Sequence, residues 1–157
     1  MTNSKPAYTL REATPDDALI LEGLFRQLGY EIDASEIEQN FALIAPSNAF
    51  HAVVAEKEGQ IVGFAGLQFL HWLHRVDPVA RLTALVIDER HRGQGIGQLL
   101  VDHVEQFATK AGCRVLEVSS SNYRAKSGTH DFYFGLGYQD TAGKATYFLK
   151  ELVSSED

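Results

Sequence analysis

One stretch decides how this chain folds: residues 81–111, RLTALVIDERHRGQGIGQLLVDHVEQFATKA. Its pattern predicts an apolar strand at Leu82–Ile87, a polar turn, a glycine-rich loop and an amphipathic helix over Ile96–Ala111. The loop, RGQGIG at residues 92–97, places three glycines where the helix begins. Glycine lets backbone approach a ligand closely, and the free N–H groups of a helix start attract anions. A phosphate-bearing ligand is therefore the first hypothesis.

The composition describes an ordinary globular chain. Its 157 residues fit one domain, residues 1–157 with a core at about 7–152. A formal net charge of −7 argues against a nucleic-acid partner and mildly favours cationic substrates. The first residues lack the apolar core of a signal peptide, and no apolar run approaches the ~20 residues of a membrane span. With a single cysteine, Cys113, the chain has no internal disulfide, so we expect a cytoplasmic protein without a membrane partner.

Hydrophobic periodicity and turn signals predict a mixed α/β domain. Thr14 followed by Pro15 marks one helix start, and Asp33 with Glu36 marks another. Gly63 and Gly66 interrupt one long strand-like run and indicate a bulge or bend there. The predicted strands are Ala7–Arg11, Phe50–Glu56, Ile61–Leu73, Leu82–Ile87, Cys113–Ser119 and Thr146–Leu149. The helix that starts at Thr14 is predicted to end at Gly29, and the helix that starts at Asp33 is predicted to end before Pro46. Two further helices are predicted over Ile96–Ala111 and Thr129–Leu136.

The residues alone test two ligand classes and one ligand-free interpretation of the glycine loop, and they leave more than one open. A nucleoside triphosphate loop needs a lysine after its last glycine, and none follows Gly97. A dinucleotide fingerprint needs a third glycine where Gln98 stands, although Glu117 lies ~20 residues further on, as that fingerprint requires. A plain helix cap would need no ligand, but surplus glycine in a first turn costs about 1 kcal/mol per residue.

Beyond the loop itself, the order of motifs resembles the GNAT superfamily of N-acetyltransferases. The run Arg92-x-x-Gly95-x-Gly97 resembles that family's coenzyme A pyrophosphate loop, and the segment FYFGLGY at residues 132–138 resembles its downstream signature. The resemblance implies an α/β (α+β) fold with a mixed, mostly antiparallel sheet of about six to seven strands. It further implies about four helices, a sheet splayed between strands four and five, and a homodimer.

The resemblance also implies a site that binds acetyl-CoA and moves its acetyl group to an amine. Tyr133 matches the family's general acid, which protonates the departing thiolate. Asn122 is placed as a coenzyme contact, although it precedes Tyr133 by eleven residues where the family usually has about seven. The residues implied to bind the coenzyme are Leu85, Val86, Ile87, Arg92, Gly93, Gln94, Gly95, Ile96, Gly97 and Asn122.

The acceptor side of the reaction is less defined. The acceptor is expected to be a primary amine of a small molecule or peptide, cationic by the acidity argument, with Glu117 as the candidate base. Tyr30, Glu31, His74 and Asp77 are further candidates to line its site. His71-x-x-His74 lacks a third clear ligand, so no metal is expected. A non-catalytic acyl-CoA-binding module of the same fold is the alternative, and Tyr133 favours the enzyme.

Overall fold

The computed structural model describes residues 7–120, 128–141, 144 and 148–152. They fall into two compact units, Met1–Ser119 and Ser120–Asp157, which are described here one at a time. The sheet, three of the four helices and the glycine loop all belong to the first unit. The expectation of a single domain over residues 1–157 stays a prediction.

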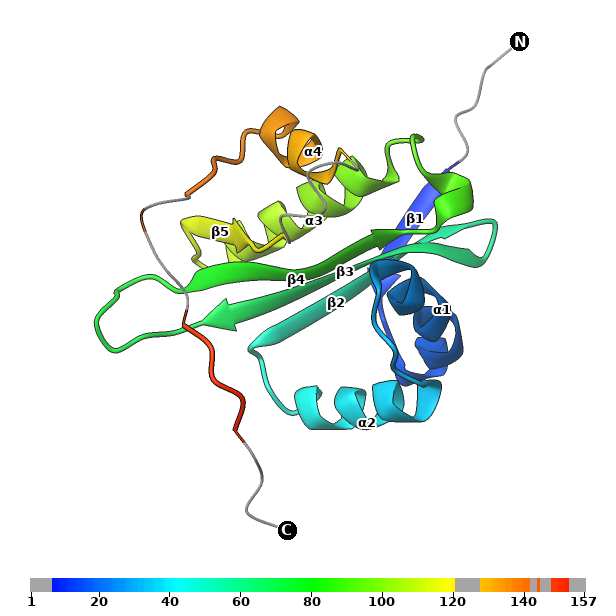
Figure 1. The fold of residues 1–157 in the computed structure, drawn as a ribbon, viewed down its shortest axis with the longest axis horizontal. Helices are drawn as coiled ribbons and strands as arrows, with labels where there is room; N and C mark the ends of the chain where they lie inside the picture. Colours follow the sequence, from blue (N-terminus) through cyan, green and yellow to red (C-terminus); the bar gives the residue numbers. More distant parts are fainter. Residues whose placement is uncertain (1–6, 121–127, 142–143, 145–147, 153–157) are drawn as a thin grey trace. The chain divides into compact units, whose positions relative to one another are not determined.

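The first unit is built on a five-stranded sheet in the order β1-β2-β3-β4-β5 (Figure 1). The strands β1 to β4 pair antiparallel with their neighbours, whereas β5 pairs parallel with β4. Parallel pairing needs a crossover, and the long helix α3 supplies it. The strands are β1 (Tyr8–Glu12), β2 (Phe50–Lys57), β3 (Gln60–Leu70), β4 (Val79–Ile87) and β5 (Val115–Val118).

Helices cover both faces of this sheet. The helices α1 (Ala18–Leu28) and α2 (Ala34–Ile44) lie on one face, and α3 (Ile96–Lys110) lies on the other (Figure 1). Adjacent strand residues point to opposite faces. Accordingly, Phe64 belongs to the core under α1, whereas a side chain at Gly63 would come within 3.1 Å of Leu100 on α3. Gly63 therefore allows α3 to pack closely on β3.

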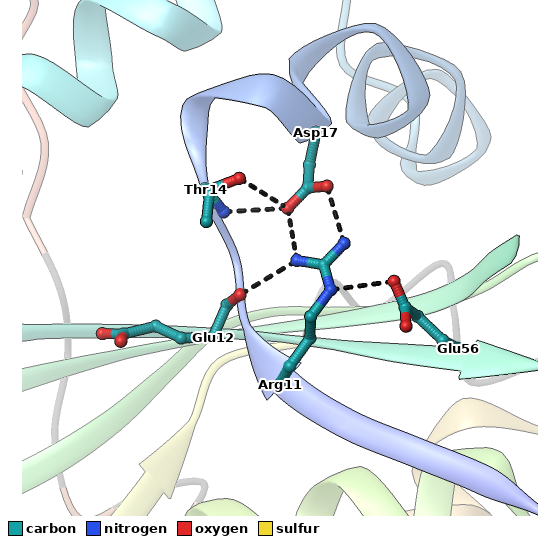
Figure 2. A network of polar contacts seen from close by, with 5 residues as sticks. All are labelled: Arg11, Glu12, Thr14, Asp17 and Glu56. Atoms are coloured by element: carbon teal, nitrogen blue, oxygen red, sulfur yellow. Dashed lines mark hydrogen bonds and ion pairs between the residues drawn. The ribbon is translucent and has the colours of Figure 1, made fainter. Parts of the chain in front are cut away.

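A polar network joins the first strand to the first helix (Figure 2). The Arg11 guanidinium donates to both carboxylate oxygens of Asp17, each at 2.8 Å, and its Nε donates to Glu56 on β2 at 2.8 Å. Asp17 also accepts from the backbone N–H of Thr14 at 2.8 Å, which closes a capping box around the 3-10 turn η1 (Pro15–Asp17). Arg11 lowers the pKa of the Asp17 carboxyl below its usual value, because the ion pair stabilises the charged form.

The local signals in the first half of the chain are confirmed. Gly29 adopts a left-handed φ of 97° at the end of α1, and Asp33 with Glu36 forms the capping box of α2. The pairing of β3 with β4 shifts register between Gly66 and Leu67, which is the expected irregularity.

Several predicted bounds are wrong. The strand predicted over Ile61–Leu73 ends at Leu70, because Trp72 and Leu73 lie in an exposed turn. The next strand begins at Val79, three residues before the expected Leu82, and β5 is shorter than Cys113–Ser119.

The expected six to seven strands are also a miscount, since the described residues contain five. The final strand predicted at Thr146–Leu149 falls partly outside the described residues, and Phe148 and Leu149 have no regular structure. Both side chains are exposed, at 94% and 88%. The strand count implied by the resemblance is therefore too high for the described residues.

The second unit contains the helix α4 (Thr129–Gly135). Its C-terminal end is closed by Gly137, which has a left-handed φ of 91° and donates its N–H to the Phe134 carbonyl at 3.0 Å. This end matches the predicted helix and its glycine cap. The aromatic ring of Tyr133 packs edge-to-face on Phe132 and Tyr138, with centroids 5.2 Å and 5.7 Å away.

Candidate active site

The glycine loop adopts a backbone conformation that is strained for residues other than glycine. Gly93 and Gly95 have φ values of 75° and 84°, in the left-handed region that L side chains rarely adopt. Nothing lies within 4 Å of where their Cβ atoms would be, so backbone conformation alone makes glycine necessary here. Both residues are exposed. The loop therefore presents its backbone to solvent.

The start of α3 has the features of an anion site. Gly95 is the N-cap residue of α3, and no side chain caps this helix end. The N–H groups of the first turn, from Ile96 to Gln98, have no intrahelical acceptor, and the helix dipole adds a favourable field. Arg92 is exposed beside them, and its Nε donates to the Ile87 carbonyl at 3.2 Å. An anion at this helix end would meet backbone donors and a nearby positive charge.

Buried Asp88 organises the turn between β4 and the loop. Its backbone N–H donates to Val62 on β3 at 2.9 Å, which holds the turn against the sheet. Its carboxylate accepts from the backbone N–H and the guanidinium of Arg90, at 3.0 Å and 2.9 Å. The hydrogen bonds from Arg90 lower the pKa of the Asp88 carboxyl. The glycine loop thus starts from a rigid base, the 3-10 turn η2 (Glu89–His91).

The second half of β4 has an edge that β5 does not cover. β5 pairs with β4 only from Val79 to Leu82 and ends at Val118. Among the described residues, Ala84–Ile87 therefore pair on one side only, with β3. This opening lies where the splay between strands four and five was expected. Of the predicted coenzyme contacts here, Val86 is buried in the core under α1, whereas Leu85 and Ile87 are half-buried.

Glu117, the candidate base, is held in an ion pair. It lies on β5 directly opposite Arg81 on β4, and its Oε1 accepts from Arg81 Nη2 at 2.7 Å and from Nε at 3.0 Å. Both side chains are about one-third exposed. This pair gives Glu117 a structural role, because it joins β4 and β5 one residue before their pairing ends at Leu82 and Val118.

Two of the predicted site residues do not belong to the described part of the first unit. Tyr133 belongs to the second unit, where it is half-buried among aromatic rings. Asn122 lies outside the described residues, so its predicted role stays a prediction. Within the first unit, the glycine loop follows the end of β4, whereas Glu117 lies opposite Arg81, nearer the start of that strand.

A pocket of about 630 Å³ lies between α1, α2 and β4. Tyr30 and Glu31, which sequence reasoning singled out, both line it. Its inner wall includes Ala84, which belongs to the half of β4 that β5 leaves uncovered. The remaining lining residues are Phe25, Leu28, Ile32, Glu36, Gln39 and Asn40. The α2 residues were missed, because polar positions on a helix surface carry no signal of what they face.

The other acceptor-site candidates, His74 and Asp77, have partners in the structure, and their predicted role stays a prediction. Asp77 pairs with Arg114 at 3.2 Å, and His74 stacks on Trp72 with centroids 5.9 Å apart. Among the residues that the structure describes, no group of three His, Cys, Asp or Glu side chains is arranged to hold a metal. Cys113 is buried, and burial raises the pKa of its thiol, as expected of a core cysteine.

One finding bears on the membrane expectation. Within the described ranges, no helix combines the length and apolar character that crossing a membrane requires. The expected cytoplasmic location and homodimer stay predictions.

Comparison with known proteins places these features in a family. A family model described as "Acetyltransferase (GNAT) family" matches residues 17–138. The chain is 31% identical to an aminoalkylphosphonate N-acetyltransferase of Salmonella typhimurium, over 92% of this chain and 93% of that protein. It is 28% identical to an aminoglycoside N(6')-acetyltransferase of Stenotrophomonas maltophilia, over 95% and 97%.

A solved structure agrees with the fold. An aminoglycoside N-acetyltransferase in complex with CoA superposes with a TM-score of 0.81 at 19% identity, over 96% of this chain and 99% of that one. At this identity the similarity concerns the fold alone. The match extends over nearly the whole of both chains and agrees with the expected α+β fold.

Proposed function

The chain belongs to the acetyltransferase (GNAT) family, and we propose that it moves the acetyl group of acetyl-CoA to a primary amine of a small cationic molecule. As an enzyme it belongs to the N-acetyltransferases. The observation that carries the choice of acceptor is the pocket beside Ala84, whose rim holds carboxylates. The alternative of a binding module without chemistry has no feature of its own in its favour.

The glycine loop is the proposed anchor for the coenzyme pyrophosphate. The N–H groups of Ile96 and Gly97 and the left-handed backbone at Gly93 and Gly95 offer donors without side chains in the way. Arg92 adds positive charge nearby. In the solved neighbour described above, CoA is the bound molecule, which supports this choice over a dinucleotide.

The open edge of β4 is the proposed binding line for the pantetheine arm. An amide-rich arm can pair with the unpaired backbone groups of Thr83–Ile87 as an added strand would. This pairing would bring the thioester end near Ala84, and therefore near the pocket. One of the Leu85–Ile87 N–H groups is suited to stabilise the oxyanion that forms as the amine attacks.

The acetyl transfer needs two proton movements. The acceptor amine must be neutral to attack, and it loses a proton as the new C–N bond forms. The C–S bond breaks, and the thiolate that leaves takes up a proton, for which Tyr133 is the proposed donor. Glu117 is the proposed base, although its pairing with Arg81 also explains its presence without catalysis. The variant Glu117→Gln separates these roles, because a base is lost while a hydrogen bond to Arg81 is kept.

The charge of the pocket favours a cationic acceptor. Glu31 is exposed at its rim, whereas the Glu36 carboxylate also accepts from the Asp33 N–H at 2.9 Å as part of the helix cap. Gln39 and Asn40 add neutral polar groups, and the pocket lining contains no lysine or arginine among the described residues. A phosphonate would require such a positive partner. The pocket therefore favours an aminoglycoside-like or polyamine acceptor over an aminoalkylphosphonate.

A thiol-release assay with acetyl-CoA tests this proposal. The acceptor panel would contain aminoglycosides, polyamines, an aminoalkylphosphonate and short peptides. We expect transfer to the cationic amines, and Glu31→Gln should raise their KM about three- to tenfold with little change in kcat. The control is Glu38→Gln, an exposed carboxylate on α2 that does not line the pocket. Transfer to the aminoalkylphosphonate alone would contradict the proposed acceptor class, and no transfer to any amine would contradict the enzyme.

A further inference from the structure

Tyr8 joins the first strand to the glycine loop. Its hydroxyl donates to Oε1 of Gln94 at 2.6 Å, across 86 positions of sequence. The connection between β4 and α3 passes beside the start of β1 in Figure 1, which allows this contact. Tyr8 is half-buried on β1, whereas Gln94 is exposed between Gly93 and Gly95. No sequence motif indicates such a pair.

The contact holds the most adaptable part of the loop. The residues on both sides of Gln94 are glycines in left-handed conformations, and glycine restricts the backbone less than any other residue type. Besides the bond from Asp88 to Val62, two further contacts anchor the connection before Gly93. The backbone N–H of Glu89 donates to Gln27 on α1 at 3.0 Å, and Arg92 Nε donates to the Ile87 carbonyl. Within the described part of the chain, Tyr8 is the side chain that reaches the segment between the glycines.

The hydrogen bond also orients the carboxamide of Gln94. A carboxamide has one acceptor oxygen and an amino group with two donor hydrogens. Tyr8 engages the oxygen, and the structure shows no partner for Nε2 of Gln94 among the described residues. The donor end of the side chain is therefore the end left for a ligand. A donor that adjoins uncapped helix N–H groups extends the same anion site.

We propose that Tyr8 is a positioning residue for coenzyme binding, whose hydroxyl holds Gln94 so that its amino group donates to a phosphate oxygen of acetyl-CoA. This inference rests on the proposed role of the glycine loop. Tyr8 acts through Gln94 and takes no part in acetyl transfer. Its loss should therefore affect coenzyme affinity and leave the chemical step unchanged.

Calorimetric titration with acetyl-CoA, together with steady-state kinetics, tests the pair. Tyr8→Phe keeps the ring and removes the hydroxyl, so we expect the Kd and KM for acetyl-CoA to rise about three- to tenfold with kcat unchanged. Gln94→Glu keeps an acceptor for Tyr8 but replaces the donor with a negative oxygen, and should weaken binding by more than about tenfold. The control is Thr9→Val, which removes an exposed hydroxyl from the opposite face of the same strand.

A double-mutant cycle separates positioning from general stability. In the Gln94→Ala background, Tyr8→Phe should cause no further loss of affinity, because the side chain it orients is gone. The same loss in both backgrounds would overturn the inference, as would an unchanged Kd in Tyr8→Phe alone.

The variant Gly95→Ala tells this failure apart from failure of the loop. If wild type binds acetyl-CoA and Gly95→Ala weakens it while Tyr8→Phe does not, only the role of Tyr8 is wrong. If wild type does not bind acetyl-CoA, or Gly95→Ala binds it as tightly as wild type, the proposed role of the loop fails as well. Melting midpoints of all variants show that each is folded at the assay temperature.

Discussion

Replacing Arg11 with methionine should destabilise the fold strongly at neutral pH and much less in acid. The side chain of Asp17 is only 8% exposed, and Arg11 supplies two of its hydrogen bonds (Figure 2). Removing one partner of a buried pair leaves a desolvated charge behind, at a typical cost of about 3–5 kcal/mol. Because Arg11 is itself 39% exposed, we expect the lower end, about 3 kcal/mol in the free energy of unfolding.

The pH dependence follows from the lowered pKa of Asp17. A carboxyl whose pKa is depressed in the folded protein contributes stability that is present above its unfolded pKa, ~3.9, and is lost as the pH falls through the folded value. In Arg11→Met the buried carboxyl has lost its cation, so it takes up a proton at higher pH than in wild type. The difference in stability between the two proteins should therefore be largest near pH 7 and narrow as the pH falls below about 5.

Urea unfolding followed by circular dichroism, at a series of pH values, measures this difference. The matched control is Arg26→Met, which breaks an exposed ion pair with Glu22 at 3.1 Å on α1. Such a pair is typically worth only about 0.3–0.5 kcal/mol. Equal destabilisation by the two substitutions, or a loss in Arg11→Met that does not change with pH, would refute the account of the Figure 2 network.

Three further predictions concern the loop, a histidine pair and the proposed acid. Gly95→Ala and Gly112→Ala both replace left-handed glycines at the ends of α3 and should each cost about 1 kcal/mol of stability, but only the former should weaken acetyl-CoA binding in a calorimetric titration. His51 and His103 lie with their Nε2 atoms 3.1 Å apart, and burial lowers the pKa of both. Their contribution to stability is therefore complete above the unfolded value of about 6.5 and is lost as the pH falls below it, so His51→Phe should flatten the dependence of the melting midpoint on pH between 7.5 and 5.5. Tyr133→Phe should lower kcat about 100-fold and leave the Kd for acetyl-CoA unchanged, and an unaltered kcat would remove Tyr133 from the mechanism.

Signals that act over a few residues were predicted well. The capping box at Asp33 and Glu36 and the left-handed glycines at Gly29 and Gly95 depend only on neighbouring backbone, and the structure has them where the sequence indicates. The ends of the strands were predicted less well. Whether Trp72 and Leu73 continue β3 depends on what covers them, and apolar character does not distinguish a buried strand from an exposed turn.

The sequence by itself determined the family, the glycine loop and the order of elements around it, because left-handed backbone and helix starts leave local traces in residue type. Only the tertiary structure decided what surrounds that loop. It placed Glu117 against Arg81, Tyr8 against Gln94, and Glu31 at the rim of a pocket lined by Ala84. Each of these contacts joins segments far apart in the chain, and a single sequence carries no local trace of such a pair. The coenzyme was therefore indicated by a motif, whereas the proposed character of the acceptor rests on how α1, α2 and β4 pack together.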